Sequence, residues 1–172
     1  VYNVSNQVSV RPKKGGFKLK KAQALDRLFS PSSIAIIGAS QDKEKGGGFV
    51  LHGLLEGGFK GKLYPVNPKQ TEVMGLKAYP SVLDIPYEVD EAIVAVAARI
   101  VPRVMAECAQ KGVKFAVVHS AGFSELGAEG RELEREMLRS AQQGGTRIVG
   151  PNCMGIYNGR VNLNTILTEA YL

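Results

Sequence analysis

Four consecutive apolar residues closed by a glycine, Ile34-Ala35-Ile36-Ile37-Gly38, constrain the fold more than any other stretch of this sequence. The run is too short for a helix, and its continuous apolar character predicts a central strand of a parallel sheet with both faces covered. A loop rich in glycine, residues 38–48, comes next. Apolar positions that one helix face can gather follow the loop until Gly57-Gly58 ends the segment.

The alternation of strand and helix continues along the chain. We expect further strands at 62–66, 91–97, 115–119 and 147–149, and further helices at 22–29, 102–110 and 127–143. This order predicts an α/β fold: a Rossmann-like doubly wound parallel sheet in three α/β/α layers. A chain of 172 residues can bury one substantial core but not two comfortable ones, so we expect a single domain.

The positive charge is concentrated ahead of the predicted domain. The formal net charge is +6, and the cations that precede the first acid are Arg11, Lys13, Lys14, Lys18, Lys20 and Lys21. The remaining basic and acidic residues balance, so the charge does not predict a nucleic-acid partner. We expect residues 1–21 to form a basic, flexible arm, 22–160 the domain, and 161–172 the start of a connection to a downstream domain.

The sequence has no signal for a membrane, for secretion or for a metal. No apolar stretch approaches the about 20 residues that cross a bilayer, and the amino terminus has no apolar signal segment. The two cysteines, Cys108 and Cys153, have neither disulfide nor metal-ligand spacing. We therefore expect a cytoplasmic protein with free thiols.

The loops after the first two strands contain the most informative candidate residues, because open parallel sheets bind ligands beyond the carboxyl ends of their strands. The first loop offers backbone N–H groups and a helix amino terminus to a phosphate, although it lacks the spacing G-x-G-x-x-G. The second strand ends in Asn67-Pro68-Lys69, where a dinucleotide site requires an acid. A lysine can pair with phosphate, so together these loops favour coenzyme A over NAD. Taken alone, the glycines of the first loop also fit an ordinary turn, and Lys69 also fits a solvated surface residue.

The remaining strand ends give no catalytic residue. His119 and Ser120 are adjacent on a strand and point to opposite faces, which excludes a nucleophile–base pair. A strand-end histidine near the rim of the crevice is the simpler interpretation of His119. The fifth strand runs into Gly150-Pro151-Asn152-Cys153, a rigid turn by its spacing. There is no Walker-type phosphate loop, so this chain cannot bind ATP by that route.

Four blocks of the sequence, residues 33–40, 61–69, 120–123 and 150–155, carry a resemblance to a known family. In this order they resemble the CoA-binding domain of ADP-forming acetyl-CoA or acyl-CoA synthetases, relatives of the succinyl-CoA ligase α subunit. The resemblance extends over residues 28–164. One departure is Val96-Ala97-Ala98 where the family often has Val-Pro-Ala, which removes a proline that stiffens the pocket wall.

The resemblance implies a set of binding residues. Residues 40–43 would meet the phosphates, Lys69 would pair with a CoA phosphate, residues 96–98 and 119–121 would line the pantetheine path, and Cys153 would lie near the thiol. The complete set of candidate residues is Gly38, Ser40, Gln41, Asp42, Lys43, Asn67, Pro68, Lys69, Val96, Ala97, Ala98, His119, Ser120, Ala121, Asn152 and Cys153.

The resemblance also implies a function. The chain would be the CoA-binding domain of an NDP-forming acyl-CoA ligase, which joins an acid and CoA at the expense of ATP through a phosphohistidine in another domain. ATP, ADP and Mg²⁺ would bind only in ligase and ATP-grasp domains or subunits outside this chain, and the complete protein would be oligomeric. The alternative is an acyl-CoA-sensing regulatory module of a protein lysine acetyltransferase. A stand-alone CoA-binding protein ranks third and an NAD(P) oxidoreductase fourth.

Overall fold

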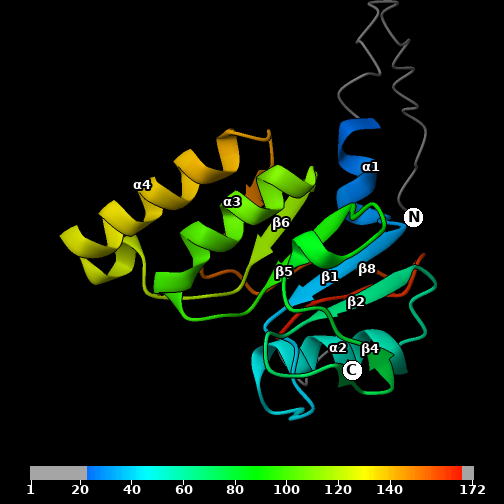
Figure 1. Ribbon diagram of the computed structural model, residues 1–172. Helices are drawn as coiled ribbons and strands as arrows, with labels where there is room; N and C mark the ends of the chain where they lie inside the picture. Colours follow the sequence, from blue (N-terminus) through cyan, green and yellow to red (C-terminus); the bar gives the residue numbers. More distant parts are fainter. Residues whose placement is uncertain (1–22, 168–172) are drawn as a thin grey trace, which may run out of the picture.

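The computed structural model describes residues 23–167, in which a five-stranded parallel sheet lies between two helical layers (Figure 1). The strands of this sheet are β1 (Ser33–Ile37), β2 (Lys62–Val66), β5 (Glu91–Val94), β6 (Phe115–Val118) and β7 (Arg147–Val149). The helices are α1 (Gln23–Phe29), α2 (Gly46–Glu56), α3 (Val101–Lys111) and α4 (Ala128–Gln142), with short 3₁₀ turns at η2 (Val82–Asp84), η3 (Ala98–Ile100) and η4 (Ser124–Leu126). The predicted basic arm, residues 1–21, lies outside the described residues.

The strand order confirms the predicted doubly wound sheet. The order is β2-β1-β5-β6-β7, so the chain leaves β1 on one side to make β2 and returns on its other side to make β5. Ile37, the last residue of β1, is in register with Val66 of β2 and with Val94 of β5. Parallel strands in this register end at one edge, and the winding reverses between β1 and β5. This edge is where an open α/β sheet binds ligands.

The apolar run that predicted a central strand is buried on both faces. Ala35 and Ile37 pack in one core cluster, with apolar residues of α3 and α4. Ile34 and Ile36 pack in the other, with residues of α1 and α2. Figure 1 shows α3 and α4 side by side on one side of the sheet and α2 on the other. No helix within residues 23–167 is both long and apolar enough to span a membrane.

The third strand ends earlier than predicted, and a hairpin over residues 72–77 was not predicted. The pattern indicated a strand over 91–97, but β5 ends at Val94, because residues 95–97 turn away at the ligand edge and lead into η3. The hairpin consists of β3 (Glu72–Val73) and β4 (Leu76–Lys77), joined by Met74 and Gly75. Both turn residues have positive φ, as the tight two-residue turn of a β-hairpin requires.

Part of the segment after residue 160 pairs with the residues that precede it. β9 (Leu163–Asn164) pairs in antiparallel orientation with β8 (Tyr157–Asn158). Leu163 is completely buried in the core cluster on the α2 side of the sheet. The described part of this segment therefore packs against the core of the domain. The start of a connection to another domain remains a prediction for residues 161–172.

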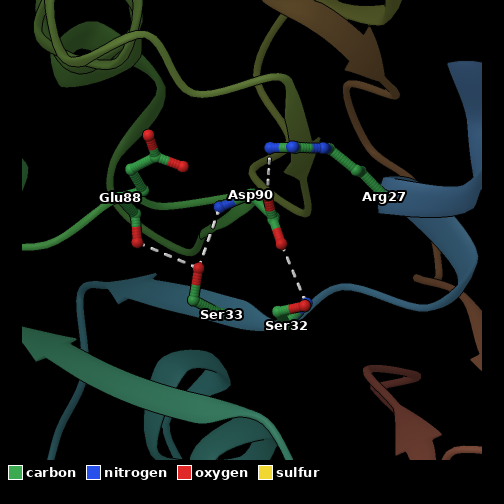
Figure 2. A network of polar contacts seen from close by, with 5 residues as sticks. All are labelled: Arg27, Ser32, Ser33, Glu88 and Asp90. Carbon is green, nitrogen blue, oxygen red and sulfur yellow. Dashed lines mark hydrogen bonds and ion pairs between the residues drawn. The ribbon is translucent and has the colours of Figure 1, made fainter.

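A network of polar contacts fixes α1 at the edge opposite the ligand loops (Figure 2). The Arg27 guanidinium donates to one carboxylate oxygen of Asp90 at 2.6 Å, and the Ser32 backbone N–H donates to the other at 2.9 Å. The Ser33 hydroxyl donates to the Glu88 carbonyl at 3.0 Å and accepts from the Asp90 N–H at 3.1 Å. The network therefore joins α1 to the starts of β1 and β5.

The next residue, Glu91, is fully buried in the central part of the sheet. Neither of its carboxyl oxygens has a hydrogen-bond partner among the described residues. Burial raises the pKa of Glu91 well above its ordinary value, and the nearby Asp90 raises it further. Because an ionised carboxylate without a partner is costly to bury, we infer that Glu91 is protonated in the folded domain.

This burial makes a prediction about the pH dependence of stability. Below the ordinary pKa of a glutamate carboxyl, Glu91 is protonated in both the folded and the unfolded chain. As the pH rises above that value, the unfolded chain releases a proton that the folded domain keeps. The free energy of unfolding therefore falls until the pH reaches the raised pKa of the folded domain. Relative to wild type, Glu91→Gln, which cannot ionise, should gain about 1.4 kcal/mol of unfolding free energy per pH unit in this window. Urea denaturation between pH 4 and pH 8 measures the difference, and a constant difference would contradict the account.

Candidate functional site

The candidate residues lie on five loops at the carboxyl edge of the sheet, and hydrogen bonds join these loops to one another. Gly38 N–H donates to the Val66 carbonyl at 3.0 Å, and Ala95 N–H donates to the Ile37 carbonyl at 2.9 Å. On the other half of the sheet, His119 N–H donates to the Val94 carbonyl at 3.0 Å. The loops are therefore held by the ends of neighbouring strands, as a binding site between strands requires.

The first loop lies directly against the loop after β5. Gly38 has a φ of +92°, and a Cβ atom at this position would lie 2.3 Å from the Ala95 carbonyl oxygen. Further along, the Ser40 hydroxyl accepts from the Asp42 N–H at 3.1 Å, and the Asp42 carboxylate accepts from the Glu44 N–H at 3.0 Å. These contacts make a compact turn ahead of α2.

The start of α2 requires glycine for a steric reason. A Cβ atom at residue 47 would lie 2.2 Å from the Gly38 carbonyl oxygen, and one at residue 48 would lie 2.0 Å from the Asp42 carbonyl oxygen. The helix can therefore begin directly on the first loop only because Gly47 and Gly48 have no side chains. Lys45 occupies the N-cap position of the helix, but its side chain accepts no hydrogen bond from the first-turn N–H groups. The first-turn N–H groups are thus suited to an anionic ligand.

The second loop is joined to the first by one side chain. The Asn67 amide nitrogen donates to the Ala39 carbonyl at 2.8 Å, and its carboxamide oxygen accepts from the Lys69 N–H at 2.8 Å. Pro68 and Lys69 are exposed at the tip of this loop. The Lys69 ammonium is therefore free to meet a ligand at the edge of the first loop.

The loops after β5 and β6 form a second joined pair. The Ser120 hydroxyl donates to the Val96 carbonyl at 2.6 Å, so it faces away from His119. A Cβ atom at Gly122 would lie 3.0 Å from the Ala98 side chain, which shows how closely the two loops pass. Ala97 and Ala121 are exposed on them. A cavity of about 550 Å³ adjoins these loops, lined by Ala98 and Gly122 on one side and by residues of α4 on the other.

The loops after β6 and β7 bring His119 and Cys153 together. The Nδ1 atom of His119 lies 3.2 Å from the Cys153 carbonyl oxygen, so Nδ1 must carry the proton of a neutral ring. Nε2 is buried and has no hydrogen-bond partner among the described residues. Burial lowers the pKa of His119, and the hydrogen bond to Cys153 opposes this only in part. His119 is therefore neutral near pH 7 and is more buried than the rim position that we expected.

Cys153 is a weak nucleophile in this arrangement. Its thiol lies 3.3 Å from the Val118 carbonyl oxygen, to which it donates, and burial raises its pKa. The preceding residue, Asn152, is exposed with a φ of +51°, and its backbone N–H donates to the Ser120 carbonyl at 3.0 Å. Hydrogen bonds therefore hold this turn against the loop after β6, and its thiol is protonated and weakly nucleophilic.

All the candidate residues thus lie at one edge, and Gln41 and Asp42 also make contacts that the sequence did not indicate. The Gln41 carboxamide accepts from the Met74 N–H at 3.1 Å and approaches the Glu72 carbonyl at 3.5 Å, so it holds the unpredicted β3–β4 hairpin. The Asp42 carboxylate lies 3.4 Å from the Lys45 ammonium. Lys43, which lies between Asp42 and Lys45 in the sequence, is exposed. Contact of these residues with a ligand remains a prediction.

The fold and this edge define a Rossmann-like nucleotide-binding domain whose second strand ends in a lysine loop where dinucleotide sites carry an acid. A family model described as a CoA binding domain matches residues 32–159. The chain therefore belongs to the CoA-binding domain family.

Two similar proteins are ADP-forming acetate–CoA ligases by name. The chain is 56% identical over 131 residues to ADP-forming acetate–CoA ligase II of Archaeoglobus fulgidus, a match that covers 76% of this chain and 20% of the relative. It is 49% identical to the α subunit of ADP-forming acetate–CoA ligase II of Pyrococcus furiosus, over 85% of this chain and 32% of the subunit. This chain thus spans between a fifth and a third of the length of these relatives.

A solved structure gives the same result. Acetyl-coenzyme A synthetase 1 of Candidatus Korarchaeum cryptofilum, in complex with phosphate and ADP, is 48% identical and superposes with a TM-score of 0.79, over 83% of this chain and 30% of that one. The agreement confirms the predicted fold class and the resemblance stated on the four sequence blocks.

Two adjacent glycines test the close contact between α2 and the first loop. Gly47→Ala should lower the unfolding free energy by about 2 kcal/mol or more, because its methyl group would meet the Gly38 carbonyl. Gly46→Ala is the matched control: its Cβ atom would be 3.7 Å from the Ala95 side chain, an ordinary contact. The control should stay within about 0.5 kcal/mol of the wild-type value, because residue 46 is the first residue of the helix and has room for a methyl group. Equal stabilities of the two variants in thermal denaturation would refute the steric argument.

Proposed function

We propose that this chain binds coenzyme A at the carboxyl edge of its sheet and acts as the CoA-binding domain of an ADP-forming acyl-CoA ligase. The observation that carries the proposal is the lysine loop after β2, held against the first loop by Asn67 within a domain of the CoA-binding family. A cation at this position suits a phosphorylated ribose, whereas an acid would suit the free hydroxyls of NAD.

The proposed pose follows the five loops. The diphosphate would lie at the first turn of α2, beside residues 40–43, and Lys69 would pair with the 3′-phosphate. The pantetheine arm would follow residues 96–98 and 119–121, and its thiol would lie near Cys153. Nucleophilic groups at this end are either buried or neutral, so the domain would hold the CoA thiol intact for another domain to use.

The reaction itself would take place with parts that lie outside this chain. In the proposed ligase, ATP, ADP and Mg²⁺ would bind to ATP-grasp and ligase domains or subunits, and a phosphohistidine there would carry the phosphoryl group. The relative from Pyrococcus furiosus is named as an α subunit, which supports a partner subunit. An oligomeric, cytoplasmic ligase is the corresponding proposal for the complete protein.

The acetyltransferase alternative gains no support from the relatives reported above, which are ligases or synthetases by name. The protein that carries this domain should convert acetyl-CoA, ADP and phosphate into acetate, CoA and ATP in a coupled assay for ATP. Transfer of the acetyl group to protein lysines without ATP formation would instead favour the alternative.

The role of Lys69 can be tested by binding. Lys69→Ala should weaken CoA about tenfold while it weakens dephospho-CoA much less, because a charge-assisted contact to the 3′-phosphate is lost. Calorimetric titration with both ligands measures the two losses. Lys62→Ala is the matched control, since Lys62 is exposed at the opposite end of the same strand. Equal losses for the two ligands would exclude the 3′-phosphate contact and leave a diphosphate contact as the explanation.

A further inference from the structure

Asn67 occupies the position at which a dinucleotide-binding domain would carry its ribose-binding acid. Both ends of its carboxamide are already bonded within the protein, to the Ala39 carbonyl and to the Lys69 N–H, each at 2.8 Å. Its backbone N–H donates to the Tyr79 carbonyl at 2.9 Å. These three bonds leave Asn67 little capacity to bind a ligand directly, so its contribution must be sought in what it holds.

The two carboxamide bonds need a donor and an acceptor on one short side chain. The nitrogen must donate, because its partner is a carbonyl oxygen, and the oxygen must accept, because its partner is an N–H group. A carboxylate could keep the bond to Lys69 but would place an oxygen against the Ala39 carbonyl. Aspartate is therefore a poor substitute on two grounds: one lost bond and one added negative charge at the phosphate edge.

The residues at the two ends of this bridge belong to the two phosphate-facing loops. Ala39 is fully buried and directly precedes the turn of residues 40–43. Lys69 is exposed, so the place of its ammonium depends on where its backbone is held. The carboxamide fixes that backbone relative to the first loop, in the short local turn that asparagine favours.

We propose that Asn67 is a positioning residue that sets the distance between the Lys69 cation and the first loop, and that it thereby determines the preference for a 3′-phosphorylated ligand. This inference rests on the proposed function, because it assumes that CoA binds at this edge. It adds that the selectivity depends on a side chain that does not touch the ligand.

The experiment compares CoA with dephospho-CoA on the wild-type chain and on three variants. In Asn67→Ala the affinity for CoA should fall about tenfold and that for dephospho-CoA by much less, because two bonds that place Lys69 are lost. Asn67→Asp should reduce the ratio of the two affinities further, through repulsion of the 3′-phosphate. Gln70→Ala is the matched control. This variant removes a carboxamide from the same loop. The Gln70 carboxamide oxygen lies 3.5 Å from the Asn67 amide nitrogen and makes neither of the two bonds that place Lys69, so the ratio of the two affinities should not change.

The results separate this inference from the proposed function. An unchanged ratio in Asn67→Ala, with wild-type preference for CoA, would overturn the positioning role alone. A wild-type chain that binds neither ligand would overturn the proposed function as well. Thermal unfolding of the unliganded variants identifies loss of fold, which by itself cannot change the ratio. If Asn67→Ala does not fold, Asn67→Ser, whose hydroxyl can keep one of the two bonds, gives the same comparison.

Discussion

The ligand edge of this domain depends first on the steric contact between the first turn of α2 and the loop after β1. With Gly47 and Gly48 against the carbonyls of Gly38 and Asp42, the helix begins where the central strand ends. Two further ligand-edge loops contact the same first loop: the loop after β5 packs on Gly38, and the loop after β2 is bonded to Ala39. An uncapped helix terminus is thus fixed at the point where the strand order reverses, which is where the fold binds anionic ligands.

Much of the fold could be predicted because its signals are long or chemically distinct. The run from Ile34 to Ile37, closed by Gly38, indicated the central strand, and the burial of β1 confirms it. The β3–β4 and β8–β9 hairpins escaped prediction, because strands of two residues show no periodicity. The full burial of Glu91 could not be predicted either, since a charged residue at the start of a strand is normally read as exposed.

The site was predictable at the level of loops but not of individual roles. The order of strands and loops gives the edge at which the candidate residues gather, whereas hydrogen-bond partners depend on the packing of distant segments. Asn67 and Gln41 were both expected to meet a ligand, and the structure shows their carboxamides bonded to backbone groups of other loops. Internal hydrogen bonds thus hold the loops of this edge, and of its residues His119 is neutral and Cys153 is protonated.

Coenzyme A binding at this edge is the central claim, and calorimetric titration of the chain with CoA and, separately, with NAD and NADP tests it most directly. The account predicts that CoA binds and that neither dinucleotide does, because Asn67 stands where the dinucleotide acid would be, Lys69 adds a cation to the same loop, and the spacing G-x-G-x-x-G is absent. Binding of NAD or NADP without binding of CoA would contradict the account and place the domain among the dinucleotide-binding proteins.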